Sequence, residues 1–253
     1  GMRVDLEQLG IPSFLLVLQS ASMKNVLIII CSITSINLMA QYKYDYIWLA
    51  GDPVEDTSSN NGINVFDFNE NELIINKQSE GLHMYLSNSS ISNEEGQLLF
   101  YSNGCNINNA LHETMQGGFG LNPGFAYTSG NCPEYGNASN NGLIILPLPE
   151  SSTKYYIFHI APNVSPDIGV YTDKLYYTIV DMTLDDGFGQ VIDKNHIVLK
   201  DTLFTDMHAV KHANGEDWWV MVSKEHKNLF FKVLFTAEGV SSIQQQDIGI
   251  DID

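Results

Sequence analysis

The sequence predicts an all-β fold. From residue 41 onward the apolar clusters are short, alternating or aromatic, and each is bounded by Gly, Asn, Asp or Pro. Short alternating runs between turn residues are typical of strands, and no run has the length and period of a long helix. We therefore expect one β-rich unit over residues 41–253, because no composition break marks a second domain in that range.

About a dozen segments have the composition of strands. In chain order they are residues 44–49, 63–68, 73–77, 97–102, 143–146, 155–160, 176–181, 196–200, 207–212, 218–223, 230–235 and 241–247. Asn214-Gly215 and Lys227-Asn228 separate three of the last segments, and such turns tolerate a positive φ. The segments 207–212, 218–223 and 230–235 are therefore predicted to form an antiparallel meander.

Residues 110–141 break the strand pattern. This segment is rich in Gly and contains Cys132, so it is predicted to be a long surface insertion. A disulfide between Cys105 and Cys132 would tie the segment down, and an isolated cysteine pair usually bridges in an oxidising compartment. The alternative is two buried thiols. A zinc site is less favoured, because the pair lacks a C-x-x-C unit.

An export signal is predicted over residues 23–40. Met23 and Lys24 begin it, an apolar run covers residues 26–33, and cleavage is expected between Ala40 and Gln41. The apolar run is shorter than the ~20 residues that a membrane-spanning helix needs. Residues 1–22 are then an over-extended gene start or residues left by cloning. An uncleaved anchor that recruits residues 11–18 and a lipid anchor on Cys31 are the alternatives.

The charge balance excludes some partners. The chain has 12 Lys and Arg against 30 Asp and Glu, for a formal net charge of -18. Phosphate backbones and anionic membrane surfaces are repelled by such a surface, so nucleic acid is not expected as a partner. With 44% hydrophobic residues, the chain has enough apolar side chains to fold around a core.

Aromatic strands recur along the chain after polar turns, at residues 98–101, 155–158, 175–178 and 218–221. A repeated turn and aromatic strand favours a β-propeller of four-stranded antiparallel blades over a sandwich, because each blade reuses that pattern every ~40 to 50 residues. About a dozen strands supply roughly three blades, whereas closed propellers usually have about four to eight. The prediction is therefore a β-propeller or a partial propeller.

The order and content of several runs add a resemblance to this pattern. These runs are SISNEEGQLLFYSNGCNI, LNPG, NGLIILPLPESSTKYYIFHI, LYYTIVDMTLDDGFGQV, AVKHANGEDWWVMV and LFFKVLFTAEGV. Together they resemble the β-propeller region of large secreted proteins of Bacteroidota, which commonly end in a type IX secretion sorting domain or a gliding-motility-associated domain. The resemblance implies a secreted or cell-surface binding or scaffolding module. It departs at residue 253, where no sorting domain follows, so the expectations are a fragment of a longer protein, an unusually small propeller or an open array of blades.

Acidic clusters are the candidates for a metal site. Asp181, Asp185, Asp186 and Asp193 surround two glycines, and carboxylates on such a turn could hold Ca²⁺ weakly in an extracellular fluid. Their spacing does not match a calcium-binding loop, and acidic hairpin tips are common on an acidic protein. A second acidic turn contains these residues: Asp52, Glu55 and Asp56.

Two further pairs favour structural roles. His208 and His212 lie four residues apart, but on a strand that separates them by ~13 Å, which is too far for one metal ion. Trp218 and Trp219 are expected on opposite faces of a strand, with one ring in the core and the other against solvent or a neighbouring blade.

The function predicted from these patterns is an exported, non-catalytic binding or scaffolding module that engages an extracellular protein or glycan. No motif assigns a catalytic residue or a cofactor. The alternative is a secreted polysaccharide hydrolase or lyase on a propeller scaffold, because a pair of carboxylates in the fold cannot be seen in the sequence. The oligomeric state is left open.

Overall fold

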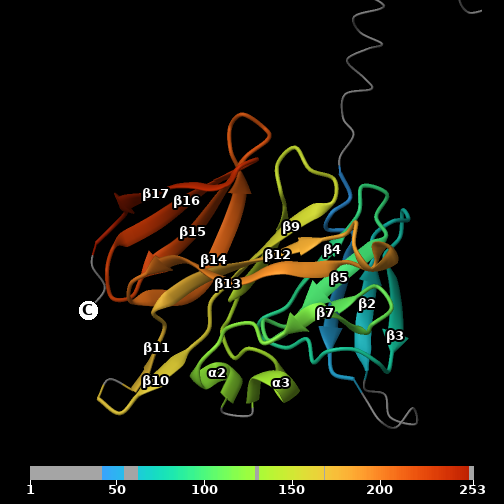
Figure 1. Cartoon of the computed structure of the whole chain (residues 1–253), viewed down its shortest axis with the longest axis horizontal. Helices are drawn as coiled ribbons and strands as arrows, with labels where there is room; N and C mark the ends of the chain where they lie inside the picture. The colour runs from blue at the N-terminus through green and yellow to red at the C-terminus, as the bar shows by residue number, and fades with distance from the viewer. Residues whose placement is uncertain (1–41, 54–61, 129–130, 168, 251–253) are drawn as a thin grey trace, which may run out of the picture. The chain divides into compact units, whose positions relative to one another are not determined.

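The computed structural model describes residues 42–53, 62–128, 131–167 and 169–250 (Figure 1). Several predictions fall outside these residues and stay predictions: the export signal, its cleavage between Ala40 and Gln41, and the roles of Glu55 and Asp56.

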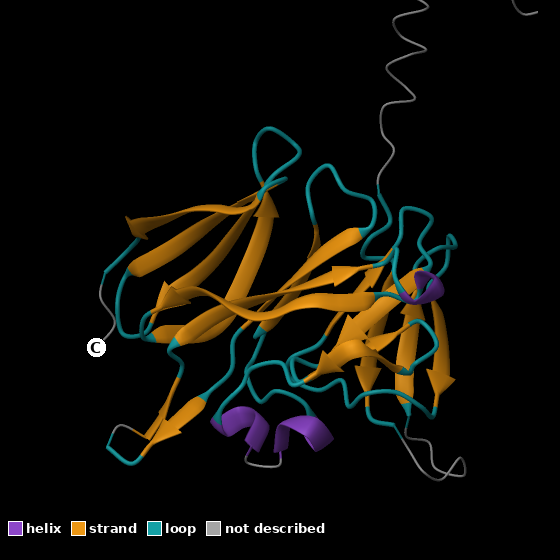
Figure 2. Cartoon of the chain, viewed as in Figure 1, coloured by secondary structure: helices purple, strands orange, loops and turns teal. Residues whose placement is uncertain are grey.

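The all-β prediction is confirmed, and strands make up most of the regular structure (Figure 2). The strands are β1 (Ile47–Gly51), β2 (Ile63–Asp67), β3 (Ile74–Gln78), β4 (Ser89–Ser92), β5 (Leu98–Ser102), β6 (Asn106–Asn109), β7 (Thr114–Phe119), β8 (Leu143–Pro147), β9 (Lys154–His159), β10 (Asn163–Ser165), β11 (Gly169–Tyr171), β12 (Lys174–Asp181), β13 (Gln190–Lys200), β14 (Leu203–Lys211), β15 (Trp218–Lys224), β16 (Leu229–Thr236) and β17 (Gly239–Asp247). The helices are short: α2 (Phe125–Thr128), α3 (Asn131–Tyr135) and the 3₁₀ turn η3 (Asp185–Gly187). Within the described ranges, no helix has the length and apolar character needed to cross a bilayer.

The strands form layers that follow the chain order. β1 to β3 make a three-stranded sheet, and β14 to β17 make a four-stranded antiparallel sheet. An eight-stranded sheet has the order β4-β5-β6-β7-β13-β12-β9-β8, and a single parallel pair, Gln116 with Gln190, joins its two halves. Its edge strands β4 and β8 also contact each other, so this sheet nearly closes into a barrel. We call β1–β3 the first layer, β4–β7 the second, β8, β9, β12 and β13 the third, and β14–β17 the fourth.

Hydrophobic clusters fill the space between successive layers. Tyr101 of β5 packs against the first layer, whereas its neighbour Phe100 packs against the third layer, where its ring lies 5.6 Å from that of Tyr155. On β9, Phe158 faces the fourth layer and lies 5.4 Å from Phe235. Because strand side chains alternate between the two faces, strands of the inner layers must be apolar on both. Each fully buried aromatic ring of this kind contributes ~1.5 to 3 kcal/mol.

Every predicted strand overlaps an observed one, and the meander is confirmed as β14-β15-β16. In its first turn Gly215 takes the expected positive φ of 80°. In the second turn the residue with positive φ is His226, at 55°, one position before the predicted Lys227-Asn228.

The prediction of a surface insertion over residues 110–141 is wrong. This segment contributes β7, which pairs with β6, and it buries Met115 and Leu121 in the core. β4, β6, β10 and β11 were also not predicted. They are short, and β4, β6 and β10 are mostly polar, so pairing with neighbouring strands, rather than composition, makes them strands.

The predicted disulfide between Cys105 and Cys132 is confirmed. The two Cα atoms lie 5.5 Å apart, and both residues are buried. Cys105 belongs to the turn between β5 and β6, and Cys132 belongs to α3. Just beyond the bridge, the Asn137 N–H donates to the Asn103 carbonyl oxygen at 2.9 Å. The bridge therefore attaches α3 to the end of the second layer.

Removing this bridge should destabilise the fold. Replacing both Cys105 and Cys132 with Ala is expected to lower the free energy of unfolding by about 3 to 4 kcal/mol, because the bridge closes a loop with a sequence separation of 27. Guanidinium unfolding followed by tryptophan fluorescence measures the change. Intact mass before and after alkylation first verifies that the wild-type pair is oxidised. Equal free energies of unfolding for the oxidised wild type and the double variant would contradict the prediction.

Candidate functional site

Several connections gather at one end of the layers. The ring of His83, in the segment between β3 and β4, lies 5.6 Å from the ring of Tyr135 on α3. α2 contacts both α3 and β10, and α2, α3 and the β10–β11 hairpin occupy the same end in Figure 1. We call this region the loop end. It is defined by Asp52, His83, Tyr85 and Tyr135 together with the pocket described below.

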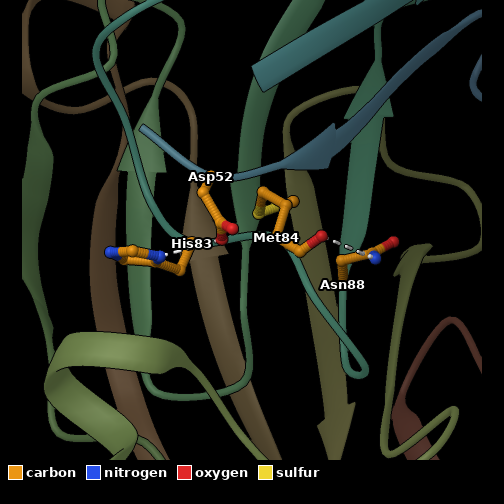
Figure 3. A network of polar contacts seen from close by, with 4 residues as sticks. All are labelled: Asp52, His83, Met84 and Asn88. Atoms are coloured by element: carbon orange, nitrogen blue, oxygen red, sulfur yellow. Dashed lines mark hydrogen bonds and ion pairs between the residues drawn. The ribbon is translucent and has the colours of Figure 1, made fainter. Parts of the chain in front are cut away.

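His83 and Asp52 meet because a backbone bridge joins their neighbours. The Gly51 N–H donates to the Met84 carbonyl oxygen at 3.2 Å, and the Met84 N–H donates to the Gly51 carbonyl oxygen at 2.8 Å. His83 Nδ1 then lies 2.9 Å from Asp52 Oδ1 (Figure 3). Gly51 can end β1 here because its φ is 115°, and an added Cβ would lie 2.6 Å from the Gly62 carbonyl oxygen.

Side-chain hydrogen bonds hold the segment that follows His83. Asn88 Nδ2 donates to the Tyr85 carbonyl oxygen at 2.8 Å and lies 3.4 Å from that of Met84 (Figure 3). The buried Ser87 hydroxyl donates to the Ser139 carbonyl oxygen at 2.5 Å. Such bonds replace the ladder that a strand would provide, so the turn that carries Tyr85 has a defined shape.

Tyr85 and Tyr135 are exposed phenols that each lie near a carboxylate. Tyr85 is 60% exposed and has Asp52 as its neighbouring carboxylate, and Tyr135 is 51% exposed and follows Glu134 in the chain. Interaction with that carboxylate, through hydrogen bonding and negative charge, raises the pKa of both phenols. The loop end therefore presents two exposed aromatic rings, each with a carboxylate nearby.

A small polar pocket lies beside α2. Its cavity volume is about 20 Å³, and it is partly open to solvent. Its lining consists of Asn122, Pro123, Phe125, Ala126, Ala161, Pro162, Asn163, Asp173, Lys174 and Tyr176. Lys174 Nζ donates to Asp173 Oδ2. Burial is the largest single influence and opposes the charged form of Lys174, but the hydrogen bond to Asp173 and the charges of Asp173, Tyr176 and Tyr171 together outweigh it and raise the pKa of the ammonium group. The pocket thus combines an ion pair, two amides and one phenol ring.

A buried neutral histidine supports this pocket. His159 is fully buried, and its ring stacks on that of Tyr176 with the centroids 5.4 Å apart. Its Nδ1 lies 2.8 Å from Asn122 Oδ1, and its Nε2 lies 3.0 Å from Thr178 Oγ1. Burial lowers the pKa of His159 to about 3, so the ring is neutral, with Nδ1 as donor to Asn122 and Nε2 as acceptor from Thr178. The network fixes two pocket residues, Asn122 and Tyr176.

The acidic residues predicted as a weak calcium site lie around the β12–β13 turn. Asp181 accepts hydrogen bonds from the hydroxyl and the N–H of Thr183, which lower the pKa of its carboxyl group. Asp185 and Asp186 belong to η3, and Asp193 lies on β13. In the described part of the chain, no group of three or more His, Cys, Asp or Glu side chains is arranged to hold a metal ion. Calcium binding stays a prediction.

The two tryptophans lie on opposite faces of a strand as predicted, whereas the two histidines do not share one strand. His208 lies on β14, whereas His212 follows it in a turn, where its Nδ1 accepts from the Asn214 N–H at 3.2 Å. Trp218 packs against the core between the third and fourth layers. The register of β15 turns Trp219 to the opposite face, near the ring of His212.

Most of the loop end was not predicted from the sequence. Asp52 was noted as a turn residue, and no role was assigned to His83, Tyr85, Tyr135 or Tyr176. A usable signal was present: Tyr85 and Tyr135 are aromatic residues inside turn-forming segments, where strand periodicity offers no core to bury them.

No known protein family, curated protein or solved structure matches the chain. The resemblance to secreted propellers therefore stays a prediction, and the functional proposal rests on the loop end.

Acid should destabilise the protein through His159. The unfolded chain binds a proton near the ordinary histidine pKa of 6.5, whereas folded His159 stays neutral down to a pH of about 3. The contribution of His159 to the free energy of unfolding is therefore fully present above pH 6.5. It falls as the pH decreases from 6.5 towards about 3, by up to ~1.4 kcal/mol per pH unit. Denaturant unfolding between about pH 7.5 and 5 measures this slope before most carboxylates titrate.

The His159→Gln variant should lose this part of the slope even if it is less stable at neutral pH. His226→Gln is the matched control, because the His226 side chain is 74% exposed. An unchanged slope in His159→Gln would contradict the assignment.

Proposed function

We propose that the chain is an exported, non-catalytic binding module that engages a neutral glycan at its loop end. The observation that carries the proposal is the pair of exposed tyrosines at the loop end, Tyr85 and Tyr135, which have Asp52 and Glu134 as neighbouring carboxylates. A phenol ring offers an apolar face for the C–H face of a sugar and a polar edge for its hydroxyl groups. Carboxylate oxygens accept hydrogen bonds from those hydroxyl groups.

The layer order supports a partial β-propeller as the scaffold. The second, third and fourth layers each run in chain order from their first strand to their last. Their first strands also touch in succession, because β4 contacts β8 and β8 contacts β14. Blades of a propeller have this arrangement, with the first strand nearest the centre. The disulfide and the predicted export signal support an extracytoplasmic location. The resemblance to secreted propellers of Bacteroidota agrees with this location and with the propeller scaffold.

Charge favours a neutral ligand over an anionic one. The chain carries a formal net charge of -18, and Asp52 and Glu134 add carboxylates to the loop end itself. Lys174, the cation of the pocket, is already paired with Asp173. An acidic polysaccharide or a nucleic acid would meet long-range repulsion at this surface, whereas an uncharged sugar would not.

A secreted hydrolase or lyase is the rival proposal. Glycoside hydrolysis with two carboxylates needs them ~5 to 10 Å apart across the bond that is cleaved. In the pocket beside α2, Asp173 is the carboxylate of the lining, and its partner there is Lys174. This composition favours binding over two-carboxylate catalysis.

Loss of the two rings should weaken glycan binding. The double variant with Tyr85→Ala and Tyr135→Ala is expected to raise Kd at least ~tenfold, because truncating aromatic side chains at the centre of an interface removes more than ~1 kcal/mol each. The probes are soluble β-glucan, xylan and mannan, screened by affinity electrophoresis and followed by calorimetry.

Two controls make the result specific. Phe188→Ala removes a partly exposed ring in the connection between β12 and β13, directly after η3, and should leave Kd unchanged. Tyr85→Phe keeps the ring and loses the hydroxyl group, so it should cost less than Tyr85→Ala. Equal binding by the double variant would refute the loop-end site, and release of reducing or unsaturated sugars from any probe would favour the rival.

A further inference from the structure

The fourth layer has an apolar face that points away from the third layer. On β15, Val220 and Val222 are buried in the core, so alternation places Trp219 and Met221 on the other face. The cross-strand register adds Val210 and Leu234 to the row of Trp219. These side chains are partly exposed, and Val210 reaches 49%.

The first layer has a similar face at the opposite end of the stack. Trp48, Phe66 and Ile75 form one row across β1, β2 and β3. Trp48 and Ile75 are each 54% exposed, whereas Ile47 and Leu49, on the other face of β1, are buried. Each end of the stack therefore presents a tryptophan flanked by apolar side chains.

The exposed face of the fourth layer corresponds to the faces that pack against the next layer inside the protein. The second strand of the second layer buries Phe100 under the third layer, and the second strand of the third layer buries Phe158 under the fourth. Trp219 and Met221 lie on the corresponding face of the second strand of the fourth layer. The fourth layer thus presents the surface that each preceding layer uses to hold the next one.

The central rows of both end faces carry no carboxylate, whereas Asp206 on the edge strand β14 lies on the outer side by alternation with the buried Met207. By strand register, the face of β1–β3 contains Trp48, Ala50, Asn64, Phe66, Ile75 and Lys77. The face of β15 and β16 contains Trp219, Met221, Ser223, Phe230, Lys232 and Leu234. Neither of these sets includes a carboxylate, although the chain has 30 Asp and Glu. A second acidic copy can therefore approach either face without meeting a carboxylate row.

We propose that the fourth layer of one copy packs on the first layer of a second copy, and that the reciprocal contact closes a two-copy ring. One chain carries both apolar faces, so the first-layer face of one copy can cover the fourth-layer face of another. Head-to-tail contacts form a closed ring when repeated application of the rotation that relates neighbouring copies leads back to the first copy. With two-fold symmetry, two copies complete the ring. With four layers in each copy, the ring has about as many sheets as the largest common propellers. This inference is independent of glycan binding.

Light scattering coupled to size-exclusion chromatography tests the ring with the full chain. We expect a dimer for the wild type, and for Trp48→Ser and Trp219→Ser a rise in dimer Kd of at least ~30-fold, which is the effect of removing a hot-spot tryptophan. Circular dichroism verifies that each variant is folded. Leu111→Ser, in the turn after β6 where the side chain is 51% exposed, is the control and should remain dimeric.

Mixing the two tryptophan variants distinguishes this geometry from other dimers. In a mixed pair, one interface keeps both tryptophans and the other has neither, so dimers should reappear when Trp48→Ser and Trp219→Ser are combined. A face-to-face dimer through one layer would not be rescued and would overturn the proposal. A monomeric wild type at about 100 μM, a concentration far above the Kd of a stable complex, or open-ended assembly would overturn it as well.

Discussion

Burial of both faces of the inner sheets is the constraint on which the structure depends. β5 and β9 each place large side chains on both sides, with Tyr101 and Phe100 on β5 and Tyr155 and Phe158 on β9. A sheet that is apolar on both faces is stable only between two other layers. The chain therefore stacks its layers in sequence order, and the connections between layers have to run around their ends. The loop end exists because those connections converge there.

Hydrogen bonds from polar side chains stabilise the loop end, whereas burial of apolar side chains stabilises the contacts between the layers. Crossing segments cannot form a ladder, so their backbone groups bond to buried side chains instead, as when Asn122 Nδ2 donates to the Gly104 carbonyl oxygen at 2.9 Å. His159 belongs to this framework because a neutral ring can donate from one nitrogen and accept at the other. The disulfide adds a covalent restraint at the same place. These hydrogen bonds and the disulfide restrain the segments that carry the exposed rings, and restraint before binding reduces the entropy that a ligand must overcome.

Local sequence patterns predicted most of the strands, but they did not predict the residues of the loop end. Strands such as β9 and β15 are visible in the sequence because their apolar runs end at turn residues. β6 (Asn106–Asn109) is invisible by the same rule, since four residues with three asparagines are typical of a turn and become a strand through pairing with β5 and β7. The site is harder still. Asp52, His83 and Tyr135 are far apart in sequence, and the bridge between Gly51 and Met84 and the disulfide bring them together.

The two proposed surfaces also have a geometric relation. In a ring closed by head-to-tail contacts, the two-fold axis is the axis of the ring, so the loop ends of both copies face the same side. A polysaccharide presents the same sugar unit many times, and two loop ends on one rim could engage one chain at two points. The second contact then forms at a high effective concentration, which raises the avidity well above the affinity of one site. Modest affinity at each pair of tyrosines would suffice for such a module, which fits a shallow, partly exposed surface better than a deep pocket.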